Sequence, residues 1–133
     1  MQSAKYRVIV AICAFAPALA CGPSEPLKVT TIQLGRSLNS DDSVATHTTS
    51  FHPKDTIYAA LINDAAGAGT VAARWVYAGQ TVSEETKKVS HNREGATEFH
   101  LQSPSAGFPP GDYRVEFQLD GKPIGTREFR VAQ

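Results

Sequence analysis

Four histidines are the side chains of this sequence best suited to acid–base chemistry or metal binding near neutral pH. They are His47, His52, His91 and His100. None of the histidines has a second histidine at the short spacing that places two ligands on one helix or turn, and no second cysteine is available beside Cys21 to complete a zinc site. We therefore expect surface histidines, with no metal and no other cofactor. His100 alternates with Phe99 and Leu101, so it should point to solvent.

The acidic residues suggest two further kinds of chemistry. Asp41 and Asp42 stand between serines, but the alternating ligands, glycine and final glutamate of a calcium loop are missing. Side-chain bonds within a turn explain this cluster. Glu84 and Glu85 could form a catalytic carboxylate pair. Their charged surroundings instead predict a solvated edge strand, which charge protects from unwanted pairing.

Nucleophile and phosphate motifs are also missing. The serines lack a Gly-x-Ser-x-Gly turn, and Gly67 and Gly69 lack the lysine and helix of a phosphate-binding loop. The sequence thus predicts no catalytic residues and a protein that is not an enzyme. An enzyme or periplasmic ligand-binding protein whose site is assembled only in three dimensions stays open as the alternative.

Residues 1–20 have the pattern of a secretory signal peptide. Lys5 and Arg7 precede the apolar run 8–15, and Ala18-Leu19-Ala20 has small residues at the cleavage spacing. The apolar run is far shorter than the ~20 residues that cross a bilayer. Without this leader the chain carries 11 basic and 13 acidic residues, a formal charge of −2. Such a balance gives no basic surface for nucleic acid.

Cys21 follows the small residues directly and is the one cysteine outside the leader. The segment 18–22 resembles the lipobox at which bacterial lipoproteins are acylated on cysteine, although Ala18 stands where that motif prefers leucine. The resemblance implies a lipoprotein-type leader and a membrane anchor through lipid on Cys21. Gly22, rather than aspartate, after the cysteine implies the outer membrane, facing the periplasm, more than the inner membrane. Ordinary cleavage after Ala20, giving a soluble secreted or periplasmic protein, is the alternative.

Residues 21–26 contain two prolines and no apolar residue after the cysteine, which predicts a short tether. Residues 27–133 suit one domain, because a chain of this length can form one hydrophobic core. Helical periodicity is not sustained anywhere, whereas short β-branched or aromatic runs recur between turn residues. The sequence predicts an all-β fold, a single antiparallel β-sandwich of about seven to eight strands.

Alternation sets the expected strands and their faces. Strands are expected at 27–34, with a bulge near residues 30 and 31, at 44–51, 56–62, 70–77, 81–89, 98–102, 113–119 and 124–131. Trp75 is the expected core anchor, and Asp120-Gly121 the strongest hairpin turn. Residues 56–62 are apolar on both faces, as in a strand central to a sheet.

The second face of that central strand is the one candidate for partner binding. Tyr58, Ala60 and Ile62 share it, on a sheet face that the domain's own core does not need. An exposed apolar patch of this kind can dock another protein. Coverage of both faces by the same domain is the preferred alternative.

The segment Pro110-Gly111-Asp112-Tyr113-Arg114-Val115 resembles the corner of immunoglobulin-like and fibronectin-like domains in which a tyrosine hydroxyl binds the backbone. From Asp55 to Val131 the chain resembles small uncharacterised bacterial lipoproteins, with segments akin to Arg74-Trp75-Val76-Tyr77 and Thr97-Glu98-Phe99-His100. That resemblance implies no activity. The function expected is a lipid-anchored, non-enzymatic binding or assembly module for another envelope protein.

Overall fold

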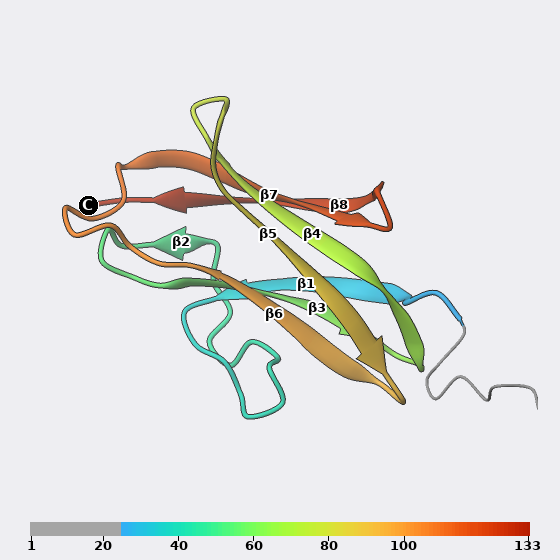
Figure 1. Ribbon diagram of the computed structural model, residues 1–133. Helices are drawn as coiled ribbons and strands as arrows, with labels where there is room; N and C mark the ends of the chain where they lie inside the picture. The colour runs from blue at the N-terminus through green and yellow to red at the C-terminus, as the bar shows by residue number, and fades with distance from the viewer. Residues whose placement is uncertain (1–24) are drawn as a thin grey trace, which may run out of the picture.

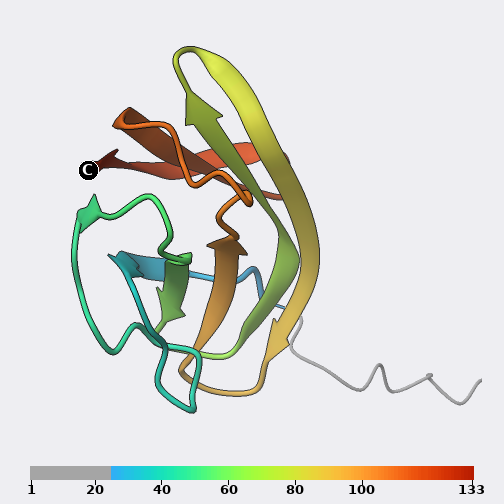
Figure 2. The same ribbon diagram turned by 90° about the vertical axis from the view of Figure 1, so that its left-hand side faces the viewer.

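The computed structural model describes residues 25–133, which form two packed β-sheets (Figures 1 and 2). The eight strands are β1 (Val29–Gly35), β2 (Ser50–Phe51), β3 (Ile57–Asn63), β4 (Gly67–Tyr77), β5 (Gln80–His91), β6 (Gly95–Leu101), β7 (Gly111–Leu119) and β8 (Lys122–Val131). One sheet has the order β1-β3-β6 and the other β2-β8-β7-β4-β5. The predicted all-β sandwich is confirmed.

Among the eight strands, every pair is antiparallel except that of β2 with β8. β2 lies parallel to β8 over two residue pairs, Ser50 with Arg130 and Phe51 with Val131. The chain therefore leaves the three-stranded sheet after β1 and joins the five-stranded sheet before it returns as β3. Residues 44–51 were expected to form one strand, and this was wrong: most of the segment is irregular and only Ser50 and Phe51 belong to a strand.

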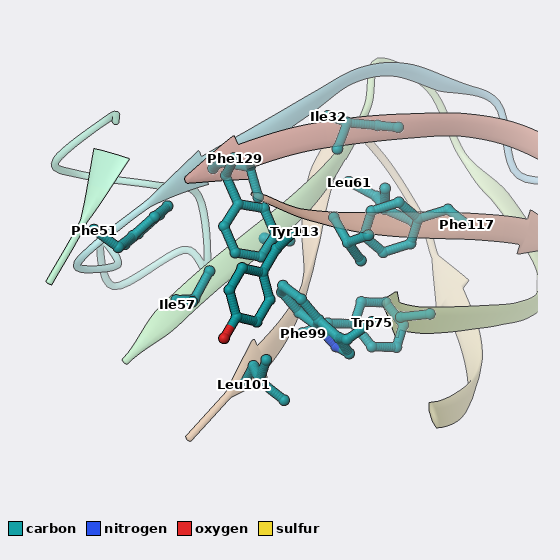
Figure 3. Close-up of a cluster of buried hydrophobic side chains, with 14 of the residues drawn as sticks. Ile32, Phe51, Ile57, Leu61, Trp75, Phe99, Leu101, Tyr113, Phe117 and Phe129 are labelled. Atoms are coloured by element: carbon teal, nitrogen blue, oxygen red, sulfur yellow. The ribbon is translucent and has the colours of Figure 1, made fainter. Parts of the chain in front are cut away.

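The core lies between the sheets and follows the alternation of the sequence (Figure 3). Trp75, the expected anchor, is 1% exposed, and its ring meets that of Phe129 edge to face with centroids 5.9 Å apart. Phe129 stacks in turn on Tyr113 at 5.4 Å. Such aromatic pairs add to the stabilisation from burial alone. β3 is the central strand of its sheet, as its two apolar faces predicted.

The last hairpin turn and the corner before β7 agree with the sequence prediction, whereas β4 and β6 each begin three residues earlier than expected. Asp120 and Gly121 have φ values of +50° and +81°, the left-handed pair that a two-residue hairpin turn requires. The corner before β7 is closed by the Tyr113 hydroxyl, which donates to the Pro109 carbonyl at 2.6 Å. The bulge expected in the first strand is present, because the pairing of β1 with β3 shifts between Val29 and Thr31.

A basic side chain bridges the sheets at each open side of the sandwich. Lys87 of β5 donates to the backbone oxygen of Glu98 in β6, and its Nζ lies 4.8 Å from the centroid of the Phe99 ring. On the other side Arg127 of β8 donates to the Ile32 oxygen of β1 at 3.3 Å. Charges that point inward at an edge strand oppose pairing with another chain.

Candidate functional site

The candidate site is the outer face of the three-stranded sheet, which we call the Tyr58 face. Side chains alternate along a strand, so the residues between the core positions of β1, β3 and β6 share this face. The strand register brings together Thr31, Gln33, Gly35, Tyr58, Ala60, Ile62, Ala96, Glu98 and His100. Among these are all three residues that the sequence proposed for partner binding.

The three proposed residues differ in exposure. Ala60 has no exposed surface, whereas Tyr58 and Ile62 on either side of it are half-buried. The Tyr58 ring lies 5.8 Å from the ring of His100, and His100 Nδ1 is 3.1 Å from a Glu98 carboxylate oxygen. His100 points to solvent as predicted, with 45% of its side chain exposed. The face thus presents an aromatic ring beside a polar pair, with the buried Ala60 at its centre.

The chain itself covers the β1 side of this face. In the connection between β1 and β2, residues 36–49, the Val44 amide donates to Gln33 Oε1 at 2.9 Å, and Val44 is 3% exposed. A Cβ on Gly35 would overlap the Thr46 oxygen and the Val44 side chain, so glycine is needed for this approach. The loop leaves four large side chains of β3 and β6 partly or fully exposed on this face: Tyr58, Ile62, Glu98 and His100.

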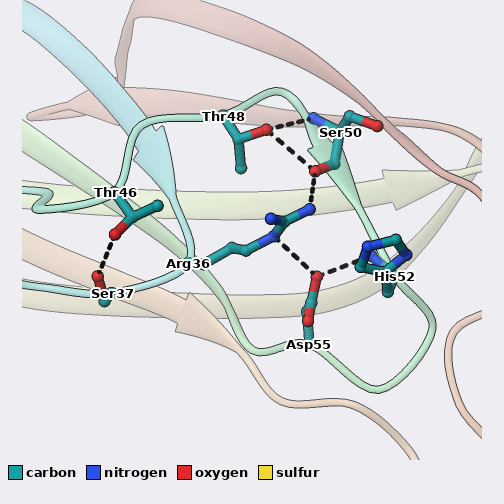
Figure 4. Close-up of polar contacts among 7 residues, drawn as sticks. All are labelled: Arg36, Ser37, Thr46, Thr48, Ser50, His52 and Asp55. Carbon is teal, nitrogen blue, oxygen red and sulfur yellow. Dashed lines mark hydrogen bonds and ion pairs between the residues drawn. The ribbon is translucent and has the colours of Figure 1, made fainter.

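One arginine holds the base of this loop (Figure 4). Arg36 Nε donates to an Asp55 carboxylate oxygen at 3.1 Å, and its Nη2 donates to the Ser50 backbone oxygen at 2.9 Å. The same Asp55 oxygen accepts the His52 amide at 2.7 Å. Sequence reasoning missed both roles: Arg36 stands outside the expected strands, and Val44 was expected to begin a strand rather than to cover Gln33.

A shallow hollow of about 440 Å³ lies at the Ile62 end of the face. Ile62 and Ala96 supply apolar surface, and Asp41, Ser43 and Arg93 supply polar groups. The Ser43 hydroxyl and amide both donate to Asp41, at 2.5 and 3.0 Å, and these hydrogen bonds hold the pKa of Asp41 below its usual value. The carboxylate is therefore occupied by a local turn, as the sequence predicted for this cluster.

The remaining sequence candidates lie apart. His47 lines a second open hollow, of about 440 Å³, beside β1 and Arg127. His52 is in the turn before β3, and His91 Nε2 lies 3.1 Å from the Thr97 hydroxyl. Among residues 25–133 no three histidine, cysteine or acidic side chains gather to hold a metal ion. Glu84 and Glu85 lie on β5, an edge strand as expected.

The outer face of the five-stranded sheet carries an ion-pair cluster. Glu116 accepts hydrogen bonds from Arg114 Nε at 2.8 Å and from Arg74 Nε and Nη2 at 2.9 and 2.7 Å. The bonds from Arg114, and then those from Arg74, hold the pKa of Glu116 below its usual value. A hollow of about 170 Å³ adjoins the cluster. The two arginines and Glu116 bind one another, so the cluster is a structural ion-pair network on a solvent-facing sheet.

Cys21, the predicted lipidation site, lies outside the described residues, as do the leader and most of the expected tether. The fold begins before Leu27: the Ala68 amide donates to the Glu25 oxygen at 2.9 Å, and Pro26 forms a β-bridge with Ala68. In the part of the chain from residue 25 onward there is no helix that could cross a bilayer.

Two packed sheets, a tyrosine corner and a chain that crosses from one sheet to the other after β1 define the class as an immunoglobulin-like β-sandwich. No family model and no curated protein matches the sequence. Solved structures do match. An immunoglobulin-like protein from Pseudomonas aeruginosa aligns with a TM-score of 0.55 and 12% identity, over 85% of this chain and 100% of that one. This likeness confirms the immunoglobulin-like fold.

Larger enzymes contain domains that align less well. A β-glucosidase from Listeria innocua matches 77% of this chain at 14% identity and a TM-score of 0.46. The alkylpurine DNA glycosylase AlkC of Pseudomonas fluorescens matches 77% at 13% identity and a TM-score of 0.46. The chain spans 16% of the length of the glucosidase and 30% of that of the glycosylase.

Proposed function

We propose that this protein is a lipid-anchored, immunoglobulin-like module of the bacterial cell envelope that binds another envelope protein and catalyses no reaction. Lipid on Cys21 holds it to the membrane, and the periplasmic side of the outer membrane is the proposed location. The leader pattern, the cysteine at its boundary and the glycine that follows support this part of the proposal.

One observation carries the binding role, namely the partly exposed Tyr58 and Ile62 on either side of the buried Ala60. All three lie on β3, which is paired on both sides and so holds them rigidly. Aromatic side chains are enriched at protein–protein interfaces, because they bury a large area with few rotatable bonds. His100 and Glu98 at the side of Tyr58 add hydrogen-bonding groups, as a polar rim does.

The anchor is tested by the intact mass of the protein purified from membranes. We expect a mature chain that begins at Cys21 and carries a diacylglyceryl group, with or without an amide-linked third chain. The Cys21→Ser variant is expected to leave the membrane fraction. A mature chain that begins with an unmodified Cys21 would refute the lipid anchor and would indicate a soluble periplasmic protein.

The binding face is tested by a photo-crosslinking amino acid placed in the lipidated protein within cells. Positions 58 and 62 report on the Tyr58 face, and position 126 serves as a matched control, because Thr126 is exposed on the outer face of the other sheet. We expect the same crosslinked envelope protein from 58 and 62 and not from 126. Crosslinks from all three positions alike, or from 126 alone, would refute the assignment of this face.

A further inference from the structure

The first described residues are fixed to the start of β4. The Leu27 amide donates to the Ala68 oxygen at 2.8 Å, in addition to the bond between Ala68 and Glu25, and Leu27 is 4% exposed. A Cβ on Gly67 would lie 2.7 Å from the Leu27 Cα, so only glycine admits this close approach. From Glu25 onward the chain therefore moves with the sandwich.

This attachment point lies at one end of the molecule. The turns β3–β4, β5–β6 and β7–β8 are at this end, since Gly67 pairs with His91 and the Thr70 amide binds Asp120. The β4–β5 turn, the β6–β7 connection and the C-terminus lie toward the opposite end (Figure 1).

We infer that the sandwich stands on the membrane on the β3–β4, β5–β6 and β7–β8 turns and directs its opposite end away from the bilayer. The inference rests on the proposed lipid at Cys21. Four residues from Cys21 to Glu25 reach at most about 14 Å in any conformation. The twelve residues of β5 span about 40 Å. The anchor is therefore much shorter than the domain, and it keeps the attached end beside the bilayer.

The charges at the attached end do not draw it toward the bilayer. Its exposed charged residues are nearly balanced in sign: Glu25, Lys28, Asp64, Arg93, Glu94, Asp120 and Lys122. Anionic lipids attract clusters of basic residues, and this mixture offers them no such cluster. The length of the tether then decides how close this end lies to the headgroups.

In the proposed orientation the two ends of β3, and so of the Tyr58 face, lie at different distances from the membrane. Tyr58 precedes Asn63 by five residues on β3, and Asn63 lies at the attached end. Five residues of strand place Tyr58 about 17 Å farther from the membrane than Asn63. Tyr58 and His100 thus lie toward the free end of the face, where a partner approaches without meeting the bilayer, and Ile62 lies at the end nearer the membrane.

The test measures quenching of a fluorophore by spin-labelled headgroups in phosphatidylcholine vesicles. Residues 25–133 contain no cysteine and Cys21 is acylated, so one introduced cysteine is labelled uniquely. Lys122→Cys reports on the attached end and Gln80→Cys on the free end; both are exposed and adjoin a hairpin turn. We expect several-fold more quenching at position 122 than at position 80. Ten Gly/Ser residues inserted after Ser24 should reduce this ratio, because the r.m.s. span becomes about 20 Å.

The possible outcomes separate this inference from the proposal of an anchor. Equal quenching at the two positions, or stronger quenching at position 80, in protein whose mass confirms the acyl group would overturn the orientation alone. A ratio that the insertion leaves unchanged would refute the tether as its cause. A protein mass that shows no acyl group on Cys21, together with no quenching at either position, would refute both the anchor and the orientation.

Discussion

Removal of the Tyr113 hydroxyl tests whether the corner before β7 holds the two sheets in place. Tyr113 is 4% exposed, and its hydroxyl bond to the Pro109 oxygen is short, at 2.6 Å. The Tyr113→Phe variant keeps the ring and its stack on Phe129 but loses this bond. The bond is partly buried, and an intramolecular hydrogen bond contributes about 0.5–1.5 kcal/mol. We expect a loss of about 1 kcal/mol in urea unfolding at pH 7.

The same hydroxyl gives this loss a pH dependence. Burial, and then the nearby Tyr77, raise the pKa of Tyr113 to about 12. An unfolded tyrosine ionises near pH 10. Between these values the folded state holds a proton that the unfolded state releases, so stability falls as pH rises. The advantage of tyrosine over phenylalanine is thus full below about pH 10 and shrinks as pH rises toward 12.

Tyr77 provides a matched control for this experiment. Its hydroxyl also donates to a proline carbonyl, that of Pro110, but at 3.1 Å and in an exposed position. Tyr77→Phe should cost less than about 0.5 kcal/mol, because water can replace the bond. The reasoning is refuted if Tyr113→Phe is no less stable than the parent at pH 7, or if the difference between them is the same at pH 8 and pH 11.5.

Substitutions at three other places test the contacts described above. Glu116→Gln should lower the free energy of unfolding by less than about 1 kcal/mol at pH 7, because the ion pairs are exposed. The pKa of Glu116 is lower in the folded than in the unfolded protein, where it is near 4.3. The stabilisation is therefore present above the unfolded pKa and is lost as pH falls through the folded pKa. Urea unfolding of both proteins at pH 7 and pH 3 measures this change. Lys87→Ser combined with Arg127→Ser should increase concentration-dependent association in sedimentation, whereas Lys88→Ser, on the outer side of the same strand, should not. Gly35→Ala should cost about 1–3 kcal/mol in thermal or urea unfolding, because the added methyl group displaces the covering loop; an unchanged stability would contradict that packing.

The sandwich could be predicted because alternation records which side of a strand is buried. Val115 and Phe117 alternate with polar residues, and both are at most 1% exposed in β7. The two apolar faces of residues 56–62 placed that strand at the centre of its sheet, and Asp120-Gly121 set the register of the last hairpin. Each of these signals acts between residues that are close in sequence or that repeat with period two.

The covering loop could not be predicted in this way. The apolar Val44 and Phe51 at the ends of residues 44–51 suggested a strand, but Val44 packs outside one sheet and Phe51 inside the sandwich. Arg36 fixes the loop through Asp55, nineteen residues away, and no periodic pattern links the two. The parallel pairing of β2 with β8 joins residues about eighty positions apart, so local sequence carries no record of it.

The size of the uncovered surface limits how the proposed module can bind. Tyr58, Ile62 and His100 lie on two adjacent strands, which gives a strip roughly 10 Å wide and 17 Å long. Such a strip is about a quarter of the roughly 800 Å² that each partner contributes to a stable interface. A partner that uses this strip alone should therefore bind weakly in solution. Lipid on Cys21 would hold both proteins at one membrane and raise their effective concentration, so that a weak contact suffices. Affinity for the crosslinked partner should then be high on shared vesicles and low between the soluble Cys21→Ser protein and the partner in solution. Equal affinities in the two settings would show that a larger surface, including the loops at the free end, makes the contact.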